Sequence, residues 1–242
     1  MRPLFIVPLK KNSKRLPNKN FLDFCGKPLF EWSLEQTVIA SKNYPGSKII
    51  VATDAIEEVV RLSLNNADVY AENVEIFKLP DWLCQDPYQL ASPCVYVIKD
   101  TFNRDLCASF DCFVLVQITN PLILAEDIIK CIDSYINYGK SIRSFTNVDR
   151  LWMLEHNNED CSYLGFIPVP KNMEIMQSCV GVLVQDISSF SECNDVVNAK
   201  FDINVLPYNL PKERAVDIDD SIDFEYAKVL MKRRLMECDN NQ

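Results

Sequence analysis

The fold is decided where an apolar run passes directly into a basic one, in LFIVPLKKNSKRLPNKN, residues 4–20. Residues 4–9 are consecutive and apolar, which is typical of a strand that is buried on both faces of a sheet. The remainder is polar and carries five cations, but it has no acid and no glycine. The stretch therefore predicts a buried first strand that ends in a cationic loop.

Apolar runs and amphipathic stretches alternate along the rest of the chain. This alternation predicts an α/β fold with a mostly parallel sheet and helices on both faces. Further strands are expected at 48–53, 74–78, 112–117, 141–146, 181–187 and 202–206. Helices are expected near 29–41, 55–65, 91–103 and 125–137, and a last one from Ser221. In that last helix Ile222, Tyr226, Val229 and Leu230 share a face, and we expect this apolar stripe to close the domain.

Composition limits the class of protein. The 242 residues are 48% hydrophobic and 24% charged, which suits one soluble domain with an ordinary core. The formal net charge of −9 disfavours nucleic acid and anionic membrane as partners. The ten cysteines form no Cys-x-x-Cys pair and His156 is the single histidine, so structural zinc lacks its ligand spacing. We expect reduced thiols, no membrane helix and a cytoplasmic location.

Residues 148–178 interrupt the alternation. Two runs with large apolar side chains, 151–154 and 163–167, flank a polar turn, and this pattern predicts a β-hairpin. An isolated hairpin is marginally stable in water, so these strands need a surface to pack on. Two alternatives are open: the hairpin folds onto its own core, or it packs against a second subunit and makes a homodimer.

The cationic loop is the first candidate site. Ligands of open α/β sheets bind at the carboxyl ends of strands, and this loop directly follows the first strand. Its clustered donors suit a polyphosphate, with side chains in place of the glycine-rich backbone of common phosphate loops. The alternative is a charge run that only faces solvent.

The second candidate site is the acidic segment Val216-Asp217-Ile218-Asp219-Asp220. In an extended segment alternate side chains share a side, so Asp217 and Asp219 lie together and repel each other unless a cation separates them. Mg²⁺ accepts one or two carboxylates and fills its other positions with water and phosphate oxygens. Alternatively, Asp219, Asp220 and Ser221 cap the last helix, and Asp220 and Ser221 can do so while the other two carboxylates hold the metal.

The third candidate is Gln117, at the end of the strand expected at 112–117. A glutamine at the carboxyl end of a strand has the donor and the acceptor that recognise a substrate hydroxyl or the edge of a base. A turn without a ligand is the alternative. Taken together, the three sites indicate a nucleoside triphosphate with magnesium.

The residues of these sites resemble those of one family. Residues 10–20, followed by Phe24-Cys25-Gly26-Lys27-Pro28-Leu29, resemble the opening of the CMP-sialic acid synthetases, the acylneuraminate cytidylyltransferase family. Val51-Ala52-Thr53-Asp54, residues 116–122 and Gly181-Val182-Leu183-Val184 are similar to further motifs, in family order. Residues 216–219 with Asp223 are similar to the family's Ile-Asp-Ile-Asp…Asp ending. The resemblance covers nearly the whole chain.

The resemblance implies a Rossmann-like nucleotide-diphospho-sugar transferase fold in one domain, residues 1–242, with a dimerisation hairpin inserted around 148–178. It implies a homodimeric enzyme that uses Mg²⁺ and CTP, transfers CMP to the anomeric hydroxyl of a nine-carbon, sialic-acid-like 2-keto acid sugar and releases pyrophosphate. Alternatives are 3-deoxy-octulosonic acid as the acceptor and a catalytically degraded relative that binds a nucleotide. An acidic α/β interaction protein is the alternative from another class.

The resemblance also implies roles for single residues. Lys10, an arginine in the family, Lys19 and Gln117 are the expected catalytic residues, and Gln117 would contact the acid sugar. Asp217 and Asp219 would hold Mg²⁺. The expected nucleotide-binding residues are Lys10, Asn12, Ser13, Lys14, Lys19, Asn20 and Asp86.

Several positions differ from the family pattern. Lys10 keeps the charge of the family arginine but loses its two-pronged donor geometry. Other family arginines are replaced by Leu79, Ile123 and Ser178. Each replacement removes a polar contact that the family has.

Overall fold

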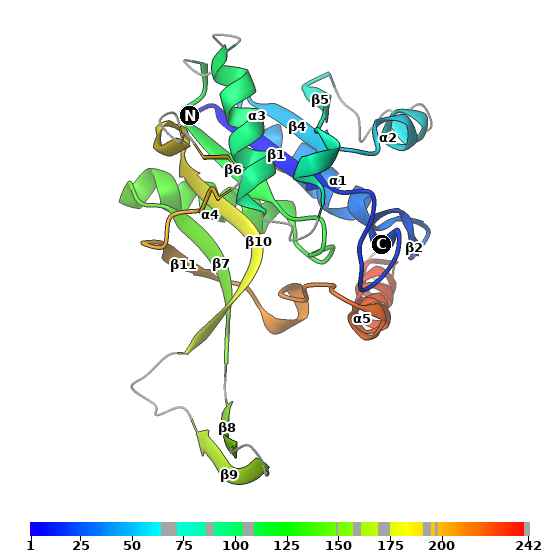
Figure 1. Ribbon diagram of the computed structural model, residues 1–242, viewed down its shortest axis with the longest axis vertical. Coiled ribbons are helices and arrows are strands. Elements are labelled where there is room, and N and C mark those ends of the chain that lie inside the picture. The colour runs from blue at the N-terminus through cyan, green and yellow to red at the C-terminus, as the bar shows by residue number, and fades with distance from the viewer. Residues whose placement is uncertain are drawn as a thin grey trace.

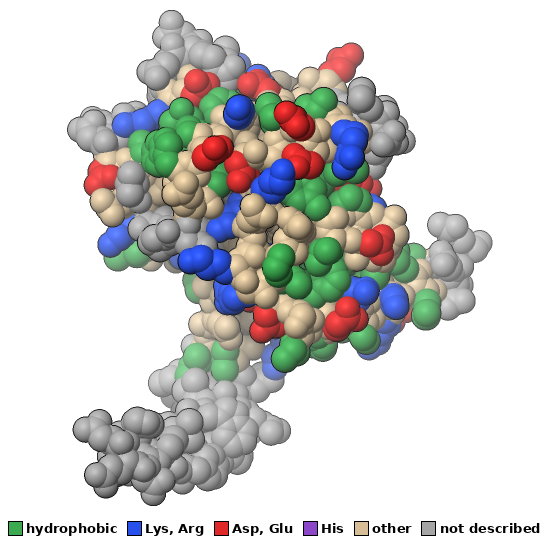
Figure 2. All heavy atoms as spheres, turned by 45° about the vertical axis from the view of Figure 1, so that its right-hand side comes forward, with side chains coloured by type: hydrophobic (Ala, Val, Ile, Leu, Met, Phe, Trp, Pro, Cys, Tyr) green, Lys and Arg blue, Asp and Glu red, His purple; other side chains and the backbone are tan. Residues whose placement is uncertain are grey.

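A seven-stranded sheet with helices on both faces forms the body of the protein, and a β-hairpin projects from it (Figure 1). The computed structural model describes residues 1–63, 72–85, 90–103, 109–148, 150–156, 161–168, 175–190, 195–196 and 198–239. No helix in these ranges is long and apolar enough to cross a membrane. Figure 2 shows basic and acidic side chains interspersed over the visible face, with hydrophobic side chains in small groups between them.

The strand order in the sheet is β11-β7-β10-β6-β1-β4-β5. The strands are β1 (Pro3–Leu9), β4 (Lys48–Thr53), β5 (Val74–Lys78), β6 (Cys112–Val116), β7 (Ile142–Asn147), β10 (Met176–Asp186) and β11 (Leu206–Asn209). Every neighbouring pair is parallel except the two that β10 makes, which are antiparallel, with β6 and with β7. The predicted α/β fold with a mostly parallel sheet is confirmed, and its order brings the ends of β1 and β6 side by side.

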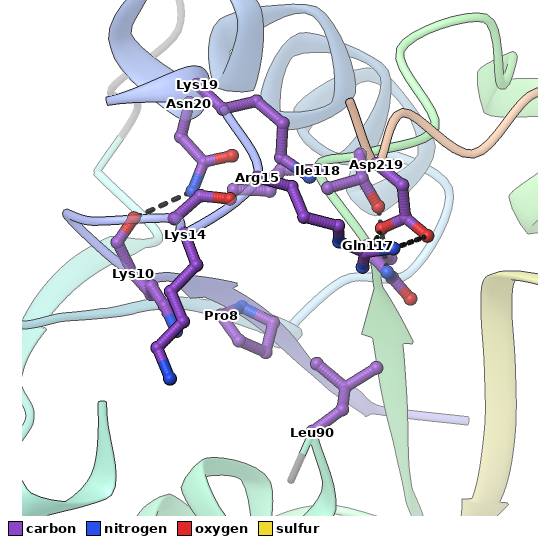
Figure 3. Close-up of a pocket in the computed structure, with 12 residues that line it drawn as sticks. Pro8, Lys10, Lys14, Arg15, Lys19, Asn20, Leu90, Gln117, Ile118 and Asp219 are labelled. Atoms are coloured by element: carbon purple, nitrogen blue, oxygen red, sulfur yellow. Dashed lines mark hydrogen bonds and ion pairs between the residues drawn. The ribbon is translucent and has the colours of Figure 1, made fainter. Parts of the chain in front are cut away.

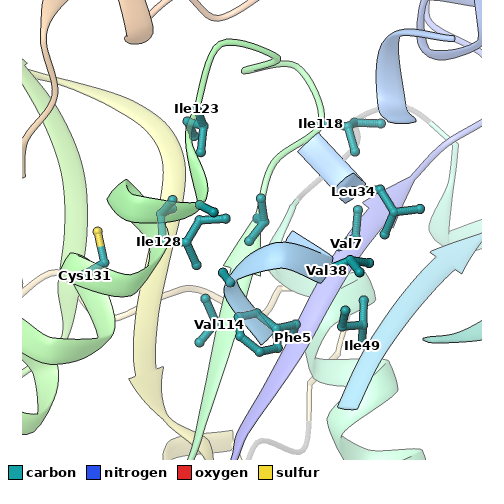
Figure 4. Close-up of a cluster of buried hydrophobic side chains, with 14 of the residues drawn as sticks. Phe5, Val7, Leu34, Val38, Ile49, Val114, Ile118, Ile123, Ile128 and Cys131 are labelled. Carbon is teal, nitrogen blue, oxygen red and sulfur yellow. The ribbon is translucent and has the colours of Figure 1, made fainter. Parts of the chain in front are cut away.

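Successive side chains of β1 belong to two different cores. Phe5 and Val7 join the core beneath α1 (Leu29–Ser41), α2 (Ile56–Ser63) and α4 (Ala125–Tyr138), part of which is drawn in Figure 4. Leu4 and Ile6 join the core on the opposite face, beneath α3 (Ala91–Asn103). All four side chains are fully buried, because both faces of the central strand are covered. This is why the strand is a continuous apolar run.

The predicted helices are all present, close to the expected bounds. The last one is α5 (Ser221–Asp239), and apart from the two strands of the hairpin the remaining elements are short. They are η1 (Lys19–Phe21), β2 (Asp23–Phe24), β3 (Lys27–Pro28), η2 (Asp81–Leu83), η4 (Ile187–Phe190) and η5 (Lys212–Arg214). The helices are therefore the part of the fold that hydrophobic spacing predicts best.

Two strand predictions are wrong in position. The strand expected at 202–206 begins only at Leu206, because Asp202 makes a turn in which its Oδ1 accepts the Asn204 N–H at 2.8 Å. The strand expected from Gly181 begins at Met176, because β10 also pairs with β7 and continues along it beyond β6. The local sequence pattern does not show which strand will pair with a segment, and in the sheet that pairing decides where the strand begins and ends.

The buried face of α5 also differs from the prediction. The side chains that pack into a third core beside α1 are Phe224, Ala227 and Met231. Of the predicted stripe, Leu230 packs partly against this core, but Ile222, Tyr226 and Val229 are exposed. Apolar residues occupy two opposite faces of this helix, so their spacing alone could not show which face is buried.

The predicted hairpin is formed by β8 (Arg150–His156) and β9 (Cys161–Pro168), which pair antiparallel as a separate two-stranded sheet. It lies beyond the ends of β7 and β10, at the bottom of Figure 1. The chain therefore leaves the central sheet after β7 and returns to it in β10.

Candidate functional site

A cavity of about 430 Å³ lies at the carboxyl ends of β1 and β6 (Figure 3). Its walls come from the loop after β1, the end of β6 and the segment before α5, which are far apart in sequence. The lining residues are Pro8, Lys10, Ser13, Lys14, Arg15, Lys19, Asn20, Leu90, Gln117, Ile118, Thr119 and Asp219. The three candidate sites of the sequence thus meet around one cavity.

The loop after β1, residues 10–20, is held by hydrogen bonds within itself and by one to Asp54, which follows β4. Asn18 adopts a left-handed conformation with φ of 54°, which asparagine tolerates better than most residues. The Asn20 Nδ2 donates to the Lys10 carbonyl at 2.7 Å, and the Lys11 N–H donates to Asp54 Oδ1 at 2.7 Å. These contacts replace the glycines of common phosphate loops and turn the loop toward the cavity.

Lys19 is the buried cation of the site. The residue begins η1 and is only 6% exposed. Its Nζ donates a hydrogen bond to the carbonyl of Ile218. Burial lowers the pKa of Lys19, while the charges of Asp219 and Asp217 act against this shift. A cation that is taken out of water in this way interacts more strongly with a nearby anion than an exposed lysine does.

Arg15 connects the basic loop to the acidic segment. Its guanidinium donates to both oxygens of Asp219, at 2.8 Å from Nη1 and 2.6 Å from Nη2. This two-pronged geometry is the strong form of a charge-assisted hydrogen bond. From the sequence, Arg15 was one of the five cations of the loop, and it was not predicted as a site residue.

Thr119 connects the end of β6 to the acidic segment. Its hydroxyl accepts a hydrogen bond from Gln117 Nε2 at 2.7 Å and donates to the carboxylate of Asp217. Its carbonyl accepts the Ile218 N–H at 2.9 Å. The placement of the two aspartates beside the cavity therefore depends on the loop that follows β6.

The start of α5 holds a different pair of carboxylates. Asp220 Oδ1 accepts the N–H groups of Ile222 and Asp223, at 2.8 and 3.1 Å. Asp223 Oδ2 in turn accepts the N–H groups of Asp219 and Asp220. The prediction that Asp220 caps the helix is confirmed, and this leaves Asp217 and Asp219 for the cavity.

Asp217 and Asp219 have the chemistry that Mg²⁺ requires. Burial is the main cause that raises the pKa of Asp217, and the Asp219 charge adds to it. Asp217 Oδ1 is buried and accepts no hydrogen bond from the described residues. In the same ranges no group of three or more His, Cys, Asp or Glu side chains could hold a metal ion by itself. A pair of carboxylates with one orphaned oxygen fits an ion that takes its other ligands from water and phosphate.

Two amide oxygens of the cavity also lack a partner within the described residues. They are Asn20 Oδ1 and Gln117 Oε1, whose amide nitrogens are tied to Lys10 and Thr119. An acceptor that is buried without a donor is costly, and a ligand hydroxyl or N–H relieves that cost. The cavity therefore offers cations for an anion and acceptors for hydroxyl groups.

Most of the predicted site residues line this cavity, two do not, and one cannot be placed because it is not described. Asn12 lines a neighbouring cavity of about 460 Å³ on the other side of the loop, which shares Lys10, Ser13 and Lys14 with the first. Asp217 is not among the lining residues, but its carboxylate accepts the hydroxyl of Thr119, which is one of them. Asp86 lies outside the described residues.

Five lining residues were not predicted as site residues: Pro8, Arg15, Leu90, Ile118 and Thr119. Arg15 and Thr119 stand inside the quoted motifs, and their polar side chains at strand ends were the available signal. Leu90 precedes α3 and carries no chemical signal, because only the fold brings it opposite β1.

Comparison with known proteins agrees with this geometry. Residues 4–69 match the family described as Cytidylyltransferase. The chain is similar to a pseudaminic acid cytidylyltransferase of Campylobacter jejuni, 23% identical over 251 residues, with 96% of this chain and 97% of that protein covered. It is also similar to an N-acylneuraminate cytidylyltransferase of Escherichia coli, 25% identical over 233 residues, with 95% of this chain and 52% of that protein covered.

A solved structure shares the fold. It is a CMP:2-keto-3-deoxy-manno-octonic acid synthetase complexed with CTP, with a TM-score of 0.60 and 14% identity, covering 97% of this chain and 100% of that one. The predicted nucleotidyltransferase fold and the resemblance to acid-sugar cytidylyltransferases are confirmed.

Proposed function

We propose, for a chain with this fold and this resemblance, that it transfers CMP from CTP to the anomeric hydroxyl of a sialic-acid-like 2-keto acid sugar and releases pyrophosphate. The observation that carries the proposal is the meeting, in one cavity, of the basic loop, the end of β6 and the acidic segment. A triphosphate needs the cations, an acceptor sugar needs the amide oxygens, and a nucleotide-bound divalent ion needs the carboxylates.

The cations position and neutralise the triphosphate. Lys10, Lys14 and Lys19 line the cavity from one loop, and Lys19 is buried among them. When the sugar hydroxyl attacks the α-phosphorus in line, negative charge grows on the departing pyrophosphate. Side chains that are already fixed stabilise that charge without reorganising, so no side-chain nucleophile is required. We assign Lys10 and Lys19 to this role.

Gln117 orients the acceptor sugar. Its Nε2 donates a hydrogen bond to Thr119 Oγ1, which fixes the orientation of the side-chain amide. The position of Oε1, which has no partner within the described residues, is therefore fixed as well. A hydroxyl or N-acyl N–H of the sugar satisfies this oxygen and places the anomeric hydroxyl. Asn20, Ser13 and Asn12 are assigned to the nucleotide side of the same loop, with Asp86.

Asp217 and Asp219 would hold Mg²⁺ between the acidic segment and the phosphates. When bound, the ion supplies charge neutralisation on the phosphate oxygens. Asp219 is the carboxylate that lines the cavity, and Asp217 contributes the orphaned Oδ1 behind it.

The acid that accepts CMP is the open choice within this proposal. The similarity to a pseudaminic acid enzyme and an N-acylneuraminate enzyme covers nearly the whole chain, which favours a nine-carbon acid. The shared fold of the octonic acid synthetase makes an eight-carbon acid the second candidate. We further propose a cytoplasmic homodimer in a single domain, with the β8–β9 hairpin as the dimerisation insert.

Thermal unfolding with CTP, ATP, GTP and UTP, each with and without Mg²⁺, tests nucleotide binding. A nucleotide at a hundredfold excess over its Kd stabilises the folded state by about 2.7 kcal/mol. We expect the largest shift for CTP with Mg²⁺, followed by pyrophosphate release when pseudaminic, N-acetylneuraminic or 3-deoxy-octulosonic acid is added. A shift without release with any acid would show a binding protein, and no shift with any nucleotide would contradict the proposal.

A further inference from the structure

Helix α5 is apolar on two opposite faces, although only one of them is buried. Phe224, Ala227 and Met231 fill the third core. The other apolar side chains, which face away from that core, are Ile222, Tyr226, Val229 and Met236, and they are 77%, 55%, 65% and 63% exposed. Single exposed apolar side chains are normal, but several of them gathered along one face of a helix indicate a contact surface. The second face therefore indicates a contact that one copy of the chain does not make.

The exposed residues form one straight stripe along the helix. Ile222, Tyr226, Val229 and Met236 follow each other at spacings of four, three and seven residues, with Arg233 in the remaining position. Spacings of three and four keep side chains on one face of a helix, and they are the spacings of a two-helix seam. We call these five residues the outer stripe. Since α5 has 19 residues, the stripe runs along a rod about 28 Å long.

We propose that the outer stripe is an interface with a second copy of this chain, in which two α5 helices pack antiparallel about a two-fold axis at Val229. Val229 lies midway between Ile222 and Met236, seven residues from each. In an antiparallel pair Val229 therefore meets its own counterpart, and Ile222 meets Met236 of the partner subunit. Self-complementarity of this kind is what a two-fold interface requires.

The charges beside the outer stripe select the antiparallel arrangement. Glu225 precedes Val229 by four residues and Lys232 follows it by three, so both lie along the same flank of the stripe. Both are exposed, and Glu225 contacts Lys228 of its own helix through Oε1 at 3.4 Å. Antiparallel packing places Glu225 beside Lys232 of the partner subunit. In a parallel pair this flank of one helix would face the opposite flank of the other, so Glu225 and Lys232 would not meet.

The area that two α5 helices can bury limits the strength of this association. A specific protein interface usually buries about 800 Å² on each partner, and a single helix face is smaller than this. The α5 pair therefore gives a weak, concentration-dependent association when it acts alone. It does not involve the β8–β9 hairpin, so the two contacts are tested separately.

Sedimentation equilibrium of the full chain over a wide concentration range tests the interface. Val229→Glu puts two carboxylates against each other at the two-fold axis, and we expect it to raise the dissociation constant at least about tenfold. The matched control is Ile136→Glu, which also adds a charge to a half-exposed isoleucine on a helix, α4, and should leave association unchanged. Melting temperatures close to that of the wild type show that both variants are folded.

A charge exchange tests the antiparallel geometry independently of the apolar contact. Glu225→Lys and Lys232→Glu should each weaken association, and the double variant should restore it. A wild-type chain that stays monomeric at every concentration overturns the proposal, as does association that Val229→Glu leaves unchanged. A double variant weaker than both single variants overturns the antiparallel arrangement.

Discussion

The basic loop at residues 10–20 and the acidic segment at 217–220 supply opposite charges to one cavity, but they are fixed in different ways. The loop is closed by bonds within itself, such as Asn20 to the Lys10 carbonyl. The acidic segment takes its position from elsewhere, because the Ile218 N–H bonds to Thr119 and the Asp217 carboxylate accepts the Thr119 hydroxyl. The closure of the loop by Asn20 is thus local, although Asp54 also holds the loop. The acidic segment, in contrast, depends on the end of β6 as well as on Arg15 and Lys19.

This difference separates two kinds of damage. A change in the loop alters the charge that meets the ligand, and at Arg15 or Lys19 it also removes one bond to the acidic segment. A change near Thr119 moves the acidic segment as a whole. Burial also differs within each region. In the loop Lys19 is buried and Lys14 is exposed. In the acidic segment Asp217 is the more buried carboxylate and Asp219 the more exposed one. The following variants test these contrasts.

Lys19→Met should cause the largest loss of activity. The variant removes the buried cation of the loop and leaves the Ile218 carbonyl without its donor. We expect kcat/KM, measured by pyrophosphate release from CTP, to fall by about 10³. Lys14→Met is the matched control, because Lys14 lines the same cavity but is exposed, and solvent screening should limit its loss to about tenfold. Equal losses for the two lysines would refute the importance of burial.

Asp217→Asn should lower the turnover rate on the order of a hundredfold, because it removes a carboxylate from the proposed metal site. Although the variant should lose activity, we do not expect it to lose stability. Burial raises the pKa of Asp217, so the folded state binds this proton more tightly than the unfolded chain does. That contribution is complete below the unfolded pKa of about 4 and is lost as pH rises through the higher folded pKa.

The asparagine variant should therefore be at least as stable as the wild type near neutral pH without Mg²⁺, and its stability should depend less on pH above about 4. Melting curves across this range provide the measurement. Asp219→Asn is the control, because Asp219 is paired with Arg15 and its loss should destabilise slightly instead. A clear loss of stability in Asp217→Asn at neutral pH would contradict the assignment of its raised pKa to burial.

The chemistry of both regions could be predicted from the sequence because it is local. Five cations without an acid identify the loop, and alternate aspartates identify the segment. The bonds between the regions could not be predicted, since Arg15 and Asp219 are 204 residues apart. The same limit applies to the fold: α4 follows from its own periodicity, whereas the start of β10 depends on β7, which no local pattern contains.

Gly181→Ala should disturb the acidic segment from a distance. A Cβ at this position would collide with Ile123 Cδ1 and lie 3.0 Å from Asn120 Oδ1, both in the loop after β6. We expect a loss of about 1–3 kcal/mol in the free energy of unfolding, measured in denaturant, together with reduced turnover. The activity falls because the Gln117 N–H bonds to the Gly181 carbonyl at 2.9 Å. Adding Ile123→Val, which removes Cδ1, should recover much of both losses, and no recovery would place the strain elsewhere.

Lys11→Ala should have the smallest effect, although Lys11 belongs to the basic loop. Its Nζ pairs with Glu58 on α2, away from the cavity, and the two side chains are 43% and 31% exposed. An exposed ion pair contributes about 0–1 kcal/mol, so we expect KM for CTP to change less than about threefold. Asp54→Ala is the informative comparison, because Asp54 accepts the backbone N–H of Lys11 and so fixes the loop itself. A bond of that kind is worth about 1.5–3 kcal/mol, and KM should rise about tenfold or more with little change in kcat. If Lys11→Ala raised KM as much as Asp54→Ala does, the Lys11 side chain would have to act on the nucleotide, and the loop would not be held by its backbone as the structure indicates.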